Sequence, residues 1–146
     1  MELIQEGFSC EYEMNVFMRM FFEKGDNAKV STFFCYENET IKTSARIEFN
    51  GKIYDGGYEY RYKKENARMD KIVSRCFVVR SFIAAAEKIK EVSIPWGALS
   101  GIRPAKVVRQ MRESGMTEEE TRKNLREVFG VTEEKIELAM TVAKNE

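Results

Sequence analysis

The sequence predicts an α+β fold, in which a small mixed or antiparallel sheet of about four strands carries helices on one face. Three observations lead to this prediction. Residues alternate between apolar and polar on both sides of Asn50-Gly51, as in a β-hairpin. A long apolar stretch after Asn66 indicates a buried helix, and the residues beyond Glu91 carry helix signals only. We therefore expect an α+β domain over residues 1–92 and a cap of about three helices over residues 93–146.

The first three elements are predicted from local patterns. Residues 1–6 are typical of a short strand, and Ser9 can cap a helix over residues 10–23. The apolar residues of this helix recur at i, i+3, i+4 and i+7: Met14, Phe17, Met18 and Phe21. The β-branched and aromatic run over residues 29–36 indicates a strand.

The hairpin around Asn50-Gly51 can be predicted to the register. A two-residue type I′ turn places Ile47 opposite Tyr54 and, without a bulge, Ile41 opposite Tyr60. The apolar residues of one strand then share a face with the tyrosines of the next, which favours a buried face. A stacking platform for bases or a flat macrocycle is the alternative interpretation of the tyrosine row.

A longer helix follows, from a cap at Asn66 to about Lys90. It is apolar almost all round, so we expect it to cross the core against the sheet. Within it, Cys76 is expected to act as a small hydrophobic residue, and Arg80 to pair with a carboxylate of the sheet.

The remaining residues read as consecutive short helices. Pro104 suits the first position of a helix. Two later helices share an opening, Gly115–Glu120 and Gly130–Lys135, with a glycine stop, a threonine N-cap and acids in the first turn. Thr117 and Glu120 have the spacing of a full capping box.

Composition narrows the class of function. The chain has no histidine, which excludes His-ligated metal sites and the Ser-His-Asp and Cys-His arrangements of nucleophilic enzymes. Its cysteines, Cys10, Cys35 and Cys76, lie far apart, whereas iron–sulfur and zinc sites usually include a closely spaced pair. We expect no catalytic residue, metal or cofactor within these 146 residues, and the reduced thiols of a cytoplasmic protein. No apolar run approaches the ~20 residues of a membrane span.

The candidate site lies on the helix that begins at Pro104. Its apolar residues lie on one side of a helical wheel, and its cations lie on the other: Arg103, Lys106, Arg109 and Arg112. One interpretation is a solvated helix back. The other is an anion site, because Arg103 and Lys106 lie at the positive end of the helix dipole, where a bound carboxylate or phosphate offsets their repulsion.

Three residues are expected to shape the junction between the sheet layer and the helical cap. Trp96 fills the gap with a large ring, and Gly101 keeps the connection flexible. Pro104 holds the preceding Arg103 in an extended conformation.

The segment Pro95–Glu146 resembles the region before the catalytic barrel in bacterial coproporphyrinogen dehydrogenases, the HemZ type of oxygen-independent coproporphyrinogen III oxidase-like proteins. The resemblance covers about a third of the chain. It rests on Trp96-Gly97, Gly101-Ile102-Arg103-Pro104, Lys106, Gly115-Met116 and Glu134-Lys135-Ile136.

The resemblance implies a parent protein of the radical-SAM class. In that family a [4Fe–4S] cluster on a CxxxCxxC loop cleaves S-adenosylmethionine to start the oxidative decarboxylation of coproporphyrinogen III in heme biosynthesis. This chain has no such motif. It would therefore be a non-catalytic N-terminal accessory domain, with the catalytic barrel of its own parent chain as partner. The basic helix would face the barrel or the carboxylates of the porphyrinogen.

Two other interpretations remain open. The chain is an RNA- or phosphate-binding module that uses the basic helix over residues 103–112, although the balance of 24 cations and 24 anions does not by itself indicate nucleic acid. Alternatively, it is a dimerisation domain, a homodimer formed through the tyrosine-bearing sheet.

Overall fold

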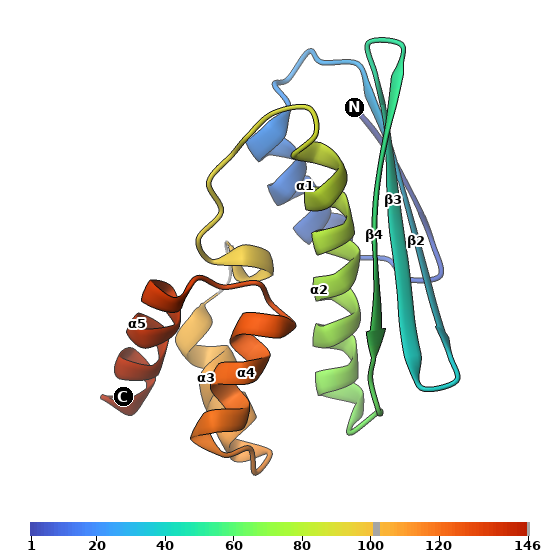
Figure 1. Ribbon diagram of the computed structural model, residues 1–146. Coiled ribbons are helices and arrows are strands. Elements are labelled where there is room, and N and C mark those ends of the chain that lie inside the picture. The colour runs from blue at the N-terminus through green and yellow to red at the C-terminus, as the bar shows by residue number, and fades with distance from the viewer. Residues whose placement is uncertain (101–102, 146) are drawn as a thin grey trace. The chain divides into compact units, whose positions relative to one another are not determined.

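The computed structural model describes residues 1–100 and 103–145, which form two compact units, Met1–Ser93 and Ile94–Glu146. The first unit contains a four-stranded sheet and two helices, and the second contains only helices (Figure 1). The predicted α+β class is confirmed. In order, the elements are β1 (Glu2–Glu6), α1 (Glu11–Phe21), β2 (Ala28–Glu37), β3 (Thr40–Phe49), β4 (Lys52–Arg61), α2 (Ala67–Ala86), the 3₁₀ turn η1 (Gly97–Leu99), α3 (Pro104–Glu113), α4 (Glu118–Glu127) and α5 (Glu133–Lys144).

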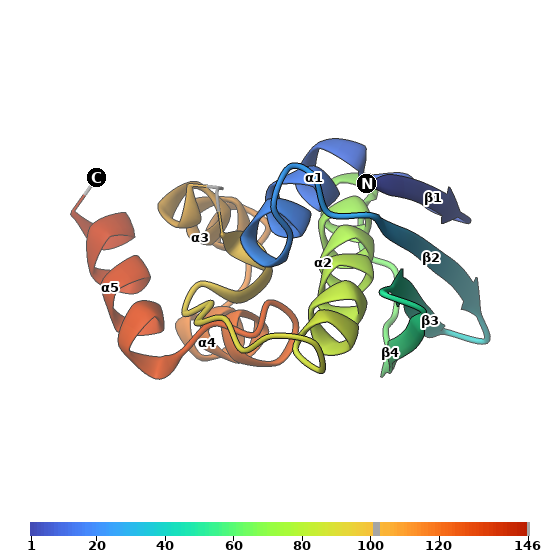
Figure 2. The same ribbon diagram turned by 90° about the horizontal axis from the view of Figure 1, so that it is seen from above.

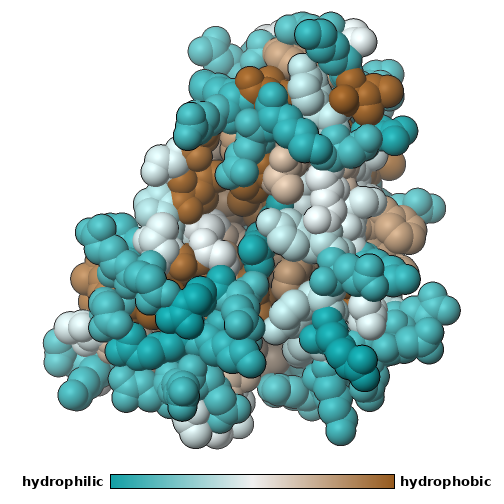
Figure 3. All heavy atoms as spheres, in the orientation of Figure 1, coloured by the Kyte–Doolittle hydropathy of each residue, from teal (hydrophilic) through white to brown (hydrophobic). Residues whose placement is uncertain are grey.

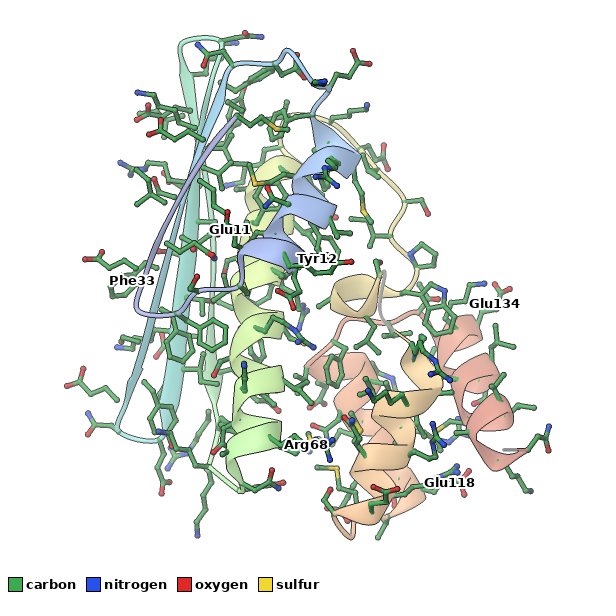
Figure 4. The ribbon with its side chains drawn as sticks, turned by 180° about the vertical axis from the view of Figure 1, so that it is seen from behind. Glu11, Tyr12, Phe33, Arg68, Glu118 and Glu134 are labelled. Atoms are coloured by element: carbon green, nitrogen blue, oxygen red, sulfur yellow. The ribbon has the colours of Figure 1, made fainter. Side chains whose placement is uncertain are left out.

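The strands lie in the order β1-β2-β3-β4. β1 runs parallel to β2, with α1 as the crossover between them, and the other two pairs are antiparallel. Both α1 and α2 lie on one face of the sheet (Figure 2). The opposite face carries no helix of this unit, and Phe33 projects from it away from α1 and α2 (Figure 4).

The hairpin has the predicted register. Ile47 pairs with Tyr54 and Ile41 pairs with Tyr60. Asn50 and Gly51 both have positive φ, 52° and 76°, as a type I′ turn requires. No bulge interrupts the strands, so the alternation carries through to the end of β4.

The tyrosine face of the hairpin packs against α2. The rings of Tyr58 and Tyr60 lie 5.9 and 4.7 Å from the ring of Phe77. The helix also lies close to the strand at Gly56, where an added Cβ would lie 2.5 Å from the backbone nitrogen of Ala85. The tyrosine row therefore belongs to the core interface and is not a platform for stacking bases.

Several predicted details at the helix ends are wrong. Ser9 does not cap α1: the N-cap is Cys10, which makes no side-chain cap bond. The backbone N–H of Cys10 instead donates to Oε1 of Gln5 at 2.9 Å, so the long-range contact with β1 sets the start of the helix. α2 ends at Ala86 rather than near Lys90, because the following amides turn back in tight bonds to Ala85 and Ala86.

The predicted cap of α2 is confirmed. The side chain of Asn66 accepts a hydrogen bond from the backbone N–H of Met69 at 2.9 Å. Further along the helix, Cys76 is fully buried, as expected of a small hydrophobic residue. The guanidinium of Arg80 lies over the Tyr58 ring, 4.6 Å from its centroid. Stacking on the sheet's aromatic face thus accommodates this cation within the core layer.

In the helical unit, two backbone segments that are distant in sequence lie side by side and are joined by hydrogen bonds. Ala98 N–H donates to the Phe129 carbonyl at 2.8 Å, and Thr132 N–H donates to the Pro95 carbonyl at 2.9 Å. Gly97 lies between these bonds with a φ of 54°. The predicted capping box of α4 is formed by Thr117 and Glu120, whereas Thr132 stands at the N-cap of α5 without a side-chain cap bond.

Candidate anion-binding site

The candidate site is the first turn of α3. Pro104 occupies the first helical position, and Arg103 is the N-cap in an extended conformation, with φ −77° and ψ 101°. Arg103 makes no side-chain cap bond. The sequence predicted this local geometry, because proline favours both the helix start and an extended residue before it.

The two faces of α3 divide as the helical wheel predicted. Val107, Val108 and Met111 are buried, with exposed fractions of 4% or less. Arg103 and Lys106 are exposed, and the first turn of α3 contains no acidic residue. Two cations therefore lie in water beside the backbone N–H groups of a helix start, an arrangement that favours a carboxylate or phosphate ligand.

The other predicted site residues have different environments. Arg109 is exposed but takes part in an interaction within the chain, so it is not a free cation. The side chain of Arg112 is half-buried in the last turn of α3, where a cation complements the helix dipole. The geometry brings Arg103 and Lys106 to one turn and leaves Arg112 at the opposite end of the helix.

The predicted junction residues are only partly described. Trp96 is half-buried, and its ring lies 5.6 Å from the ammonium of Lys135. Gly101 lies outside the described residues. The neighbouring Gly97 was not predicted to be a junction residue. Its left-handed conformation and its backbone neighbours exclude a side chain, so its position is tightly enclosed.

The acids of the following helices are largely engaged locally. Glu118 and Glu137 both bond the guanidinium of Arg122, and this raises the pKa of Arg122. Arg126 pairs with Glu133 and lowers the pKa of that carboxyl. Hydrophilic residues cover most of the visible face of these helices (Figure 3).

The sequence analysis did not predict a second group of cations, which lines a cavity in the helical unit. A cavity of about 390 Å³ is lined by residues of three helices: Arg112, Glu118, Arg122, Met140, Thr141 and Lys144. No local pattern could reveal it, because its residues are spread over more than thirty positions and meet only after α3, α4 and α5 have packed.

The three cysteines are free thiols in different environments. Cys10 and Cys76 are buried, and Cys35 is half-buried on β2. Burial raises the pKa of Cys10, and it raises the pKa of Cys76 to about 12, so both are unreactive neutral thiols in this structure. Within residues 1–100 and 103–145, no group of three or more His, Cys, Asp or Glu side chains could hold a metal ion.

Over the part of the chain that the structure describes, no helix combines the length and the apolar character needed to cross a membrane. No protein-family model, curated protein or solved structure matches the chain.

Proposed function

We propose that this chain is a non-catalytic accessory domain of a radical-SAM protein resembling oxygen-independent coproporphyrinogen III oxidases, and that it precedes the catalytic barrel. The support is the residue pattern over Pro95–Glu146. Two glycines of this pattern have clear structural roles. Gly97 leaves room for the backbone of Phe129 and Gly130, and Gly115 follows the end of α3 with a φ of 92°. Such a pattern is what a scaffold that positions a neighbouring domain would retain.

The observation that carries a role in substrate handling is the exposed, acid-free first turn of α3. Arg103 and Lys106 offer two exposed positive charges at the positive end of the helix dipole. Coproporphyrinogen has four carboxylates, and the surface of a catalytic barrel offers further acids. Either anion would relieve the unfavourable interaction of these cations with the helix dipole, about 0.3–1 kcal/mol for each.

The cofactors belong to the proposed barrel. A [4Fe–4S] cluster would supply the electron that cleaves S-adenosylmethionine there, and this chain contributes no ligand to it. The parent protein would work in the cytoplasm, where free thiols such as Cys10, Cys35 and Cys76 stay reduced.

Reading the codons that follow Glu146 tests the accessory role directly. The proposal expects three cysteines in a CxxxCxxC loop within about sixty codons, shortly after α5. A native stop codon at that point would overturn it.

The substrate contact is tested by titrating the chain with coproporphyrin III while recording backbone amide spectra by NMR. We expect saturable shifts at Arg103 and Lys106 that disappear in the Lys106→Gln variant. Lys123→Gln removes another exposed cation, from α4, and should leave the titration unchanged. Absence of any shift at millimolar ligand would refute the contact without bearing on the downstream cysteine loop.

The same cationic turn favours a second candidate function, binding of RNA phosphates. That function predicts affinity for single-stranded RNA that falls steeply with salt and is lost in the double variant Arg103→Glu, Lys106→Glu. A flat response at low salt would exclude it.

A further inference from the structure

An aromatic cavity lies at one end of the first unit, where β2 and β4 end and α2 begins (Figure 1). Its volume is about 210 Å³. The lining residues come from the loop after β1, from three parts of the β2–β4 meander and from the first turns of α2: Phe8, Phe34, Tyr36, Ile41, Tyr62, Lys64, Asp70, Lys71 and Ser74. This cavity plays no part in the proposed function.

Hydrogen bonds and ring contacts fix the aromatic walls. The hydroxyl of Tyr36 donates to the backbone carbonyl of Tyr62 at 2.8 Å. The hydroxyl of Tyr62 donates in turn to Oδ1 of Asp70 at 2.6 Å. The rings of Phe8 and Phe34 pack at 5.5 Å. Four rings are thus held in place before any ligand arrives, and pre-organisation of this kind lowers the entropic cost of binding.

The charge around the cavity favours an anion. The ammonium of Lys64 lies over the Tyr36 ring, 4.6 Å from its centroid, and Lys71 is exposed on the first turns of α2. The one carboxylate, that of Asp70, already accepts hydrogen bonds from the Tyr62 hydroxyl and from the backbone N–H of Glu65 at 3.1 Å. The lining thus carries two ammonium groups against one carboxylate, a balance of charge that favours an anionic ligand.

The positive end of α2 adds to this preference. The cavity adjoins the start of a helix of 20 residues, whose positive dipole end favours an anionic group nearby. The aromatic rings therefore favour an apolar ring in the ligand, whereas the two lysines and the helix start favour an anionic group on the same molecule. The size selects too, because a cavity of about 210 Å³ lies below the roughly 300–1,000 Å³ of sites that enclose drug-sized ligands.

We propose that this cavity binds a small ligand made of one flat apolar ring with a carboxylate or phosphate group. The ring lies among Phe34, Tyr36 and Tyr62, and the anionic group contacts the ammonium groups of Lys64 and Lys71. Residues Tyr62 and Asp70 hold the site in shape rather than contacting the anion.

Amide NMR titrations with matched probes test this site. Phenyl phosphate is expected to shift the amides of Tyr36, Lys64 and Lys71 saturably, and benzyl alcohol and inorganic phosphate are expected to bind at least about tenfold more weakly because each supplies half of the recognition. Benzylamine, which carries the same ring with a positive charge, should not bind. Raising the salt concentration should weaken phenyl phosphate, since exposed charges are screened.

Variants separate the two lysines from general surface charge. Lys64→Gln and Lys71→Gln should each weaken phenyl phosphate by about tenfold, the effect of losing one charge-assisted contact. Lys63→Gln removes the adjacent exposed charge, which does not line the cavity, and should change the affinity little. Circular dichroism spectra of the variants should match that of the unsubstituted chain, which checks that each exposed substitution leaves the fold intact. The proposal is overturned if Lys63→Gln weakens binding as much as Lys64→Gln, if benzylamine or inorganic phosphate binds as tightly as phenyl phosphate, or if no probe shifts these amides at millimolar concentration.

Discussion

Replacing Gly97 by alanine should destabilise the helical unit more than replacing Gly115 by alanine. Gly97 has a φ of 54°, a left-handed conformation that costs an L-residue about 1–2 kcal/mol. The added Cβ would lie 2.1 Å from the carbonyl oxygen of Phe129 and 2.6 Å from that of Gly130. Both obstacles are backbone atoms, so no side-chain rotation can make room.

The chain can relieve this overlap only by moving two backbone segments apart. That movement stretches the hydrogen bond from Ala98 to Phe129 and the one from Thr132 to Pro95. Each backbone bond contributes about 1 kcal/mol net. Together with the conformational cost, Gly97→Ala should lower the free energy of unfolding by about 3–4 kcal/mol.

Urea unfolding followed by the fluorescence of Trp96 measures this loss, since the chain's one tryptophan is the neighbour of Gly97. Gly115→Ala is the matched control. Gly115 also has positive φ, 92°, but nothing lies within 4 Å of its added Cβ, so only the conformational cost of about 1–2 kcal/mol applies. If the two variants unfold at the same urea concentration, the close approach at Gly97 does not exist in solution and the reasoning is refuted.

Four further predictions concern single sites. Thr117→Ala should lower the free energy of unfolding by about 1 kcal/mol, whereas Thr132→Ala should cost much less because its side chain makes no cap bond; equal losses in thermal denaturation would contradict this. Cys35 should react first with a maleimide in the native protein, and the two buried thiols only on unfolding, as counted by mass spectrometry. The guanidinium of Arg46 on the opposite strand lowers the pKa of Asp55. This ion pair therefore stabilises the hairpin at pH values above the ordinary carboxyl pKa near 4, and the stabilisation is lost as the pH falls through the lowered pKa. Carboxyl NMR would show this, and an unshifted Asp55 titration would disprove the pairing. Lys106→Glu should raise the free energy of unfolding by roughly 0.5–1 kcal/mol while weakening anion binding, and a less stable variant would argue against the dipole effect.

The parts of the fold that depend on local rules could be predicted from the sequence. The Asn50-Gly51 turn requires positive φ at both residues, and the period of two then fixes which side chains share a face. Asn66 and the Thr117 capping box likewise act over three residues and lie where expected. In these cases the partner of each group is a near neighbour in the chain.

The missed features depend on partners distant in sequence. Ser9 has the chemistry of a helix cap, yet the N-cap of α1 is Cys10, because Gln5 on β1 accepts a hydrogen bond from the backbone N–H of Cys10. The aromatic cavity joins residues from Phe8 to Ser74, and the two backbone segments around Gly97 are more than thirty residues apart. Neither could be read from spacing, since only the packed chain brings these groups together.

The site on α3 could be predicted only in part from the sequence. A comparison of its first turn with those of the other described helices supports a bound anion there. The first turns of the remaining four described α-helices all contain acids, among them Glu11 in α1 and Glu133 in α5, whereas α3 has none. A cation such as Arg103 or Lys106 in place of an acid at a helix start makes the interaction with the helix dipole less favourable by about 1 kcal/mol. The packing of Val107 does not require that exchange, because the cations lie on the opposite, exposed face. A chain that follows the dipole rule at four helix starts and departs from it at the fifth incurs a cost that packing does not explain, and a bound anion would remove it.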